Sequence, residues 1–162
     1  MARYLIPLLF FITFINSCEN LDISKKYIPS YKQIAINVVE KNIIDKSFFE
    51  NSYDKLLQEH LIKWLENNIK TDGFEGKVDI RLVSISSQEN QIQNGFQLNI
   101  SSVIEFTISK SILDSKKIIT ISGSEYGEIT GDFSMNDKSV EIENIIKKLI
   151  EKMSHELFDK LN

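Results

Sequence analysis

The chain has 162 residues but only one cysteine, two histidines and two prolines. One cysteine excludes an intramolecular disulfide framework and any metal site made of several cysteines. Two histidines leave little material for metal-dependent or nucleophilic catalysis. The formal net charge is −4, so there is no basic excess for binding nucleic acid or an anionic lipid surface. These absences weaken most enzyme classes and predict no nucleic-acid partner.

The chain also lacks an apolar run long enough to span a bilayer. Arg3 is the only charge in the first 18 residues, which read MARYLIPLLFFITFINSC. The apolar stretch 4–15 holds 12 residues. A spanning helix needs about 20, whereas about 7–15 suit the apolar region of a signal peptide. Pro7 further disfavours a stable spanning helix. We therefore interpret this stretch as the apolar region of a leader.

The apolar stretch ends in Ile15-Asn16-Ser17-Cys18, and the polar Glu19 follows. This segment resembles a bacterial lipobox, with a branched aliphatic residue three positions before the cysteine and a small residue one position before it. The resemblance implies that residues 1–17 are a signal peptide. It also implies that the sulfur of Cys18 carries a diacylglycerol and that the new N-terminus is acylated. Two or more acyl chains anchor a protein stably, whereas one binds only marginally.

Three other interpretations of the leader stay open. Ordinary secretion with an unmodified cysteine requires small residues at both positions of the cleavage motif, and Ile15 is not small. An uncleaved membrane anchor and a short apolar core helix are the others. Glu19 stands where enteric bacteria place the aspartate that marks retention in the inner membrane. By that resemblance we expect the periplasmic face of the outer membrane, and the inner membrane is the alternative.

The rest of the chain divides into a tether over 18–31 and one domain over 32–162. Apolar periodicity in the domain predicts the order β-α-β-β-β-α. Four strands with two helices on one face make a two-layer α/β sandwich whose sheet is mostly antiparallel. The expected strands cover 32–40, 77–86, 96–108 and a segment from 118, and the expected helices cover 52–70 and 138–161.

Local signals refine these elements. Ser52 is the expected cap of the first helix, and Asp137 or Ser139 that of the second. Alternation changes phase at Val83, which predicts a bulge or burial on both faces. Polar residues 87–95 predict a loop that ends in the turn dipeptide Asn94-Gly95.

Candidate chemistry is sparse. His155 and Asp159 have helical spacing for two metal ligands, whereas His60 has no such neighbour. Both histidines are expected on solvated helix surfaces. Glu125 and Glu128 are the nearest approach to an acid/base pair, and an exposed edge strand explains them better. We therefore expect no catalytic residue, no metal site and no cofactor other than the acyl anchor on Cys18.

Two further patterns have alternative explanations. Gly123, Gly127 and Gly131 recur every four residues, which indicates either close approach of the backbone to a ligand or twist and bulges in an edge strand. Lysine doublets occur at positions 25–26, 116–117 and 147–148. The first lies near the proposed lipid, where each cation adds about 1 kcal/mol at an anionic surface. The second lies at an expected hairpin tip, where it would reach a partner or a phosphorylated lipid. All three also serve as solubilising charge.

The lipobox cysteine, the short tether and the β-α-β-β-β-α order together resemble two envelope families. One is the lipopolysaccharide-assembly lipoprotein, which sits inside an outer-membrane barrel. The other is the auxiliary lipoprotein of ABC-type lipid transport systems. Residues 64–80 (WLENNIKTDGFEGKVDI) are similar to a short uncharacterised lipoprotein family of alphaproteobacteria. The resemblance implies an accessory role in envelope lipid or outer-membrane assembly, with an outer-membrane barrel or a lipid-transport subunit as partner. A small ligand- or lipid-binding module, with its pocket between helices and sheet, is the alternative.

Overall fold

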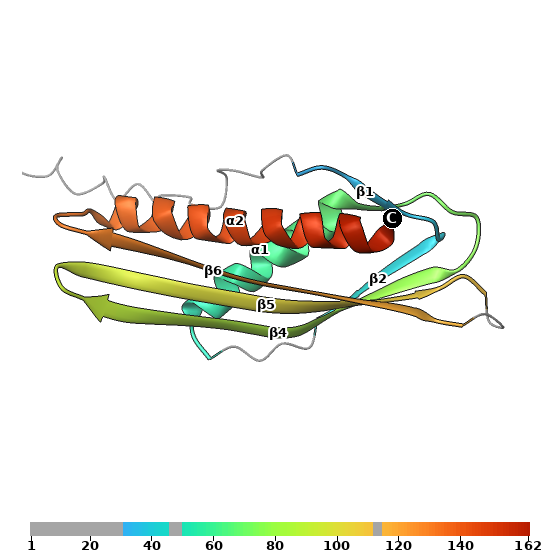
Figure 1. Ribbon diagram of the computed structural model, residues 1–162, viewed down its shortest axis with the longest axis horizontal. Coiled ribbons are helices and arrows are strands. Elements are labelled where there is room, and N and C mark those ends of the chain that lie inside the picture. The colour runs from blue at the N-terminus through green and yellow to red at the C-terminus, as the bar shows by residue number, and fades with distance from the viewer. Residues whose placement is uncertain (1–30, 46–49, 112–114) are drawn as a thin grey trace, which may run out of the picture.

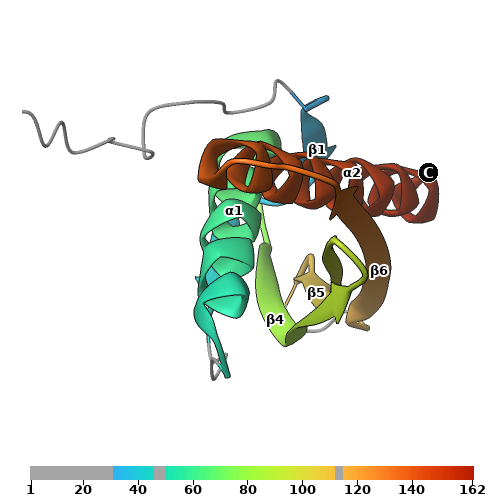
Figure 2. The same ribbon diagram turned by 90° about the vertical axis from the view of Figure 1, so that its left-hand side faces the viewer.

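The computed structural model describes residues 31–45, 50–111 and 115–162 (Figure 1). A long sheet forms one layer, and two helices cover one of its faces (Figure 2). The α/β sandwich predicted from the sequence is confirmed. The elements follow in the order β1 (Ile34–Ile36), β2 (Glu40–Ile44), α1 (Ser52–Asn68), β3 (Ile69–Thr71), β4 (Lys77–Ile92), β5 (Gly95–Ser109), β6 (Lys117–Thr130) and α2 (Met135–Leu161). Among the helices of the described ranges, none is both long and apolar enough to cross a membrane.

The main sheet has the strand order β2-β4-β5-β6. Strand β5 is antiparallel to both of its neighbours, and β2 runs parallel to β4. Along β5 every second side chain is buried beneath the helices. The strict alternation over 96–108 predicted this half-buried strand, and the structure confirms it. Fully buried aliphatic side chains from both helices and the sheet fill the space between the layers, among them Leu57, Leu61, Leu98, Ile104, Ile145 and Leu149.

The strand expected over 32–40 is wrong as a single element. Its first part is β1, which pairs with β3 in a separate two-stranded parallel sheet. The chain then bends, and the amide of Val38 donates to the carbonyl of Ile36 over 2.8 Å. Strand β2 follows and forms the edge of the main sheet. The alternation of apolar residues predicted correctly which side chains are buried, namely Ile34, Ile36 and Val38. It carried no information about which backbone each segment pairs with.

The observed cap of each helix lies one or more residues before the predicted cap. Asn51 caps α1, and its side-chain oxygen accepts from the amides of Tyr53 and Asp54. Ser134 caps α2 and forms a reciprocal capping box with Asp137. Ser52 and Ser139 lie inside their helices, so neither is the cap. Asp137 does take part, as the third helical residue of the box.

The polar stretch 87–95 is also not a loop. Strand β4 continues to Ile92, and only Gln93 and Asn94 connect it to β5. Asn94 has a φ of 58°, which is typical of a tight hairpin turn, so the turn predicted at Asn94 is confirmed. Polar residues can continue this strand because its ladder is made by the backbone, and every second residue of β4 pairs its amide and carbonyl with β5.

The predicted bulge is confirmed. The register of β4 against β5 shifts between Leu82 and Ser84, which leaves Val83 as the extra residue. Ser102, the one polar residue in the apolar row of β5, is buried beside this bulge. Its hydroxyl donates to the Ser84 carbonyl over 3.1 Å. The interruption of the apolar row therefore satisfies a backbone group at the register shift.

Two glycines of β6 mark where α2 crosses that strand. A Cβ at Gly123 would lie 2.6 Å from Cδ1 of Leu149, and one at Gly127 would lie 2.6 Å from Cδ1 of Ile145. Gly131 has a φ of +85° and terminates the strand. Strand β6 is the edge strand of the second sequence explanation, and the atoms that approach Gly123 and Gly127 belong to α2 and not to a ligand.

Candidate functional site

The predicted lipidation site, Cys18, lies outside the described residues, as do the predicted signal peptide and Lys25-Lys26. The described domain begins at Tyr31, whose carbonyl accepts from the side-chain amide of Asn68 at the end of α1 over 2.7 Å. The 13 residues from Cys18 to Tyr31 would reach at most about 45 Å if fully extended. An anchor at Cys18 would therefore hold the domain close to a membrane surface.

The structure does not bring the two histidines together. His60 lies half-buried on α1, and His155 is exposed on α2. Burial, and then the nearby Lys63, hold the pKa of His60 below its usual value, while Glu143 and Glu59 oppose the shift. Within the described ranges, no three His, Cys, Asp or Glu residues gather as they would around a metal ion.

The two candidate carboxylates, Glu125 and Glu128, lie in different surroundings. Glu125 faces the helix layer and forms an ion pair with Lys152 on α2, at 3.2 Å. Glu128 lies three residues further along β6, hence on the opposite face of the strand, and is exposed. They therefore form no acid/base pair.

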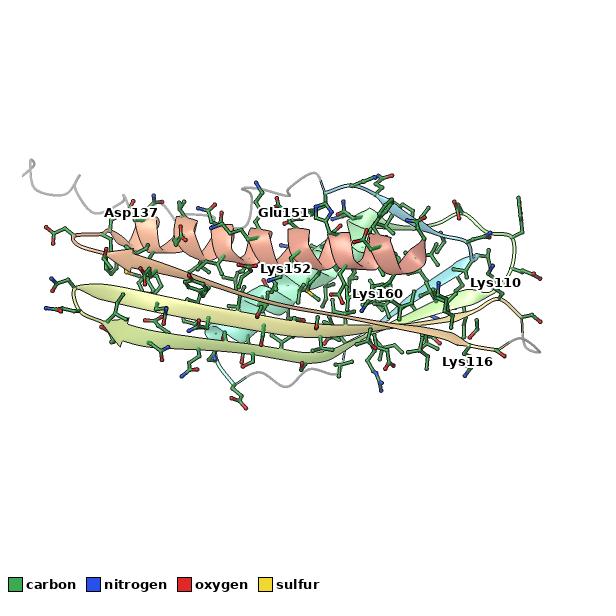
Figure 3. All side chains as sticks on the ribbon, in the orientation of Figure 1. Lys110, Lys116, Asp137, Glu151, Lys152 and Lys160 are labelled. Atoms are coloured by element: carbon green, nitrogen blue, oxygen red, sulfur yellow. The ribbon has the colours of Figure 1, made fainter. Side chains whose placement is uncertain are left out.

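The two lysine doublets within the described residues lie at the surface. Lys116 and Lys117 are exposed where β6 begins, and Figure 3 shows Lys110 and Lys116 at the same end of the molecule. Lys147 lies 4.0 Å from Glu151, one helical turn further along α2. These positions fit solubilising charge, and they leave Lys110, Lys116 and Lys117 as exposed cations at the end of the sheet where β5 ends and β6 begins.

A hollow of about 250 Å³ opens on the face of the sheet opposite the helices. Two rows of cross-strand neighbours from β4, β5 and β6 form its floor. They offer neutral hydroxyl and amide groups together with one aromatic ring, and the Tyr126 side chain is 64% exposed. The first row is Ser86, Ser101 and Ser124, and the second is Gln88, Asn99 and Tyr126.

Only part of this hollow can be predicted from the sequence. Alternation indicates the polar face of β5. The polar composition from residue 87 on predicts a loop, which hides the β4 residues of the hollow. The strand pairing that places three polar segments side by side is a tertiary property.

A second polar cluster holds the helix starts against the hairpin. The Lys138 ammonium lies 2.9 Å and 3.0 Å from the two carboxylate oxygens of Glu89, and 4.4 Å from the ring centroid of Phe96. Tyr53 on α1 also donates its hydroxyl to Glu89. The hydrogen bond from Tyr53, and then Lys138, hold the pKa of Glu89 below its usual range, although burial opposes this. The cluster joins α1, β4 and α2, so its role is structural.

Comparison with known proteins gives weak likenesses only. No protein-family model matches the sequence, and no curated protein matches it. A minor lipoprotein from Acinetobacter baumannii is 10% identical, with 75% of this chain and 87% of that chain covered and a TM-score of 0.41. The rare lipoprotein B from Shewanella oneidensis is 12% identical, with coverage of 76% and 93% and a TM-score of 0.40. An uncharacterized lipoprotein B from Nitrosomonas europaea is 10% identical, with coverage of 82% and 88% and a TM-score of 0.42. These values are too low to establish a shared fold or function.

Proposed function

We propose that this chain is a lipid-anchored protein on the periplasmic face of the bacterial outer membrane that acts by binding. In this proposal it is an accessory subunit in outer-membrane or envelope lipid assembly, and its partner is an outer-membrane barrel or a lipid-transport subunit. It is not an enzyme and uses no cofactor other than the acyl anchor. The observation that carries the proposal is the apolar stretch 4–15, which ends in the lipobox-like Ile15-Asn16-Ser17-Cys18.

The described domain is consistent with such a role. The tether from Cys18 enters it at Tyr31, so an anchored domain stays within about 45 Å of the lipid. The helices of the described residues leave one long face of the sheet uncovered (Figure 2). A short tether and an uncovered face together favour stable docking on a neighbour in the same membrane.

A small ligand-binding module without a fixed protein partner is the second candidate. The hollow beside Tyr126 is the observation that favours it. The hollow lies on the outer face of the sheet, whereas the sequence interpretation placed a pocket between helices and sheet. The space between those layers is occupied by the buried core side chains.

The experiment is in-cell cross-linking of a C-terminally tagged chain, purified from membranes, with the intact mass of the bait recorded in the same sample. The proposal predicts an acylated bait that lacks residues 1–17, joined to a barrel or a lipid-transport subunit. A Cys18→Ala bait is the matched control and should lose both the acyl mass and the cross-link. An acylated bait found without a protein partner would favour the ligand-binding module. A bait without acyl mass would overturn the lipid anchor.

A further inference from the structure

The outer edge of β6 is protected along only part of its length. Strand β6 is the last strand of the sheet, so the backbone groups of its even-numbered residues point away from β5. Side chains of α2 bind three successive groups on this edge. The Lys160 ammonium donates to the carbonyl of Thr120 (2.7 Å), the Glu156 carboxylate accepts from the amide of Ser122 (3.0 Å), and the Lys152 ammonium donates to the carbonyl of Ser124 (3.1 Å).

The spacing of this edge cover follows from helix and strand geometry. Four residues of a helix advance about 6 Å, and two residues of a strand advance about 6.6–6.8 Å. Helix α2 runs antiparallel to β6 (Figure 1), so each step back along the helix matches one step forward along the strand. Figure 3 shows Lys152 and Lys160 on the side of α2 next to β6. The next step would pair Lys148 with Tyr126.

The cover stops at that step. Among the residues that the structure describes, none bonds to the outward backbone groups of Tyr126 or Glu128. Both residues are exposed. An uncovered strand edge is a template for another extended chain, because it presents a row of unused donors and acceptors.

The hollow borders the same uncovered segment. Ser124 and Tyr126 form the β6 side of its floor, and Gln88 and Asn99 extend the floor across the sheet. A strand added beside β6 would direct every second side chain to this face. Edge pairing of this kind supplies affinity through the main chain and specificity through pockets for alternate side chains.

The charge around the uncovered end of β6 indicates which charge a binding segment should carry. Glu128 and Asp132 are exposed at the uncovered end of β6. The carboxylate of Glu141 on α2 also reaches the strand, since it lies 2.8 Å from the position of a Cβ at Gly127. Two exposed cations of α2 stand one helical turn apart on this side, Lys148 and Lys152, and Lys152 is already paired with Glu125. The excess of negative charge favours a segment that carries lysine or arginine.

We propose that residues 126–130 of β6 form a strand-addition site for an extended, basic peptide segment. The peptide pairs its backbone with the outward groups of Tyr126 and Glu128 and directs alternate side chains toward the hollow. This inference deepens the accessory role proposed above, and only the envelope identity of the partner rests on that role. Peptide binding itself requires no lipid anchor, so its failure and the failure of the anchor are distinguishable.

The test measures fluorescence anisotropy of labelled peptides with the detergent-purified full chain. The probe is a seven-residue peptide that alternates lysine with threonine. One comparison peptide has glutamate in place of lysine, and another has the same lysine sequence with methyl groups on alternate backbone nitrogens. We expect the basic peptide to bind about tenfold more tightly than either, because the others lose charge complementarity or ladder hydrogen bonds.

Three variants locate the site. Glu128→Pro removes one outward amide, which an edge strand tolerates, and should weaken binding about tenfold with an unchanged melting temperature. Glu128→Lys keeps the backbone and should abolish the preference for the basic peptide. Lys152→Met uncovers the Ser124 carbonyl and should tighten binding about threefold, since one more ladder bond becomes available.

Two outcomes would overturn the proposal. One is equal binding of the methylated and unmethylated peptides, or unchanged binding by Glu128→Pro, since neither is compatible with backbone pairing at this edge. The other is concentration-dependent dimerisation that Glu128→Pro abolishes, because the edge would then accept a second copy of the chain instead of a peptide.

Discussion

At the scale of single residues, the contact between α2 and the sheet depends on glycines of β6, which have no side chain to hold the helix away. A Cβ at Gly127 would lie 2.6 Å from both Cγ1 and Cδ1 of Ile145. Glycine is otherwise unfavourable inside a strand, so an alanine would stabilise β6 if this space were open. The close packing of α2 on β6 therefore explains why Gly123 and Gly127 carry no side chain.

This packing predicts the effect of Gly127→Ala. The added methyl group should lower the free energy of unfolding by about 1–3 kcal/mol, because it forces Ile145 and α2 away from the sheet. Urea unfolding of the variant measures the change. The double variant Gly127→Ala/Ile145→Ala should lose less stability than the sum of the two single variants, since the methyl group then fills the vacated space. Strict additivity, or a more stable Gly127→Ala variant, would contradict the close contact.

The Glu89 cluster predicts a pH dependence of stability. The pKa of Glu89 is held below its unfolded value of about 4.3 by Tyr53 and Lys138. Its contribution is therefore fully present above the unfolded pKa and is lost as the pH falls through the folded pKa. Thermal melts between pH 7 and pH 2 should show a smaller loss of stability on acidification for Glu89→Gln than for the native chain.

A matched control for this pH series is Glu75→Gln, which neutralises an exposed glutamate between β3 and β4. It should follow the native pH profile. If Glu89→Gln also follows the native profile, the hydrogen bonds at Glu89 do not stabilise the folded state.

At the scale of elements, two neighbouring residues, Asn51 and Ser52, are both of a type that caps helices well, and the structure shows that Asn51 caps α1. The Asn51 side-chain oxygen accepts from the amides of Tyr53 and Asp54 at 2.8 Å and 3.0 Å. Its amide also donates to the carbonyl of Ser87 on β4 over 3.3 Å. The N-cap therefore joins the helix to the sheet and also satisfies two amides of the first helical turn.

Asn51→Ala should cost about 1 kcal/mol of unfolding free energy, because it leaves helix amides without a partner. Ser52→Ala is the matched control, since Ser52 is exposed in the first turn, and it should change stability by less than about 0.5 kcal/mol. Chemical denaturation of both variants measures the difference. A larger loss for Ser52→Ala would place the cap where the sequence pattern alone predicted it.

At the scale of the whole molecule, Cys18 determines where the domain resides in the proposed function. Cys18→Ala should leave the leader uncut or release the domain into the soluble periplasm, because no acyl chains then bind the membrane. Cell fractionation and intact mass measure both effects. Asn20→Ala, two residues beyond the proposed lipid, is the control and should remain at the membrane. Unchanged processing and attachment of Cys18→Ala would refute the lipoprotein proposal.

The whole molecule also shows how its two sheet edges differ. Strand β2 covers one side of β4 over five residues, whereas β6 ends the sheet on the other side with 14 residues. Side chains of α2 protect part of the longer edge. No pattern in the sequence of α2 by itself shows that Lys152, Glu156 and Lys160 serve the neighbouring strand rather than each other.

The sequence alone determined the two-layer architecture, the half-buried β5, the bulge at Val83 and the turn at Asn94. These features follow from the spacing of apolar residues and from local backbone preferences, which are properties of short segments. The lipobox-like motif at Cys18 is equally local.

Only the tertiary structure decided the separate pairing of β1 with β3, the extension of β4 to Ile92 and the half-covered edge of β6. Apolar periodicity reports which face of a segment is buried, and it does not identify the strand that receives its hydrogen bonds. Backbone donors and acceptors are the same in almost every residue. Their partners, and the edge that remains without one among the described residues, therefore emerge only when the elements pack together.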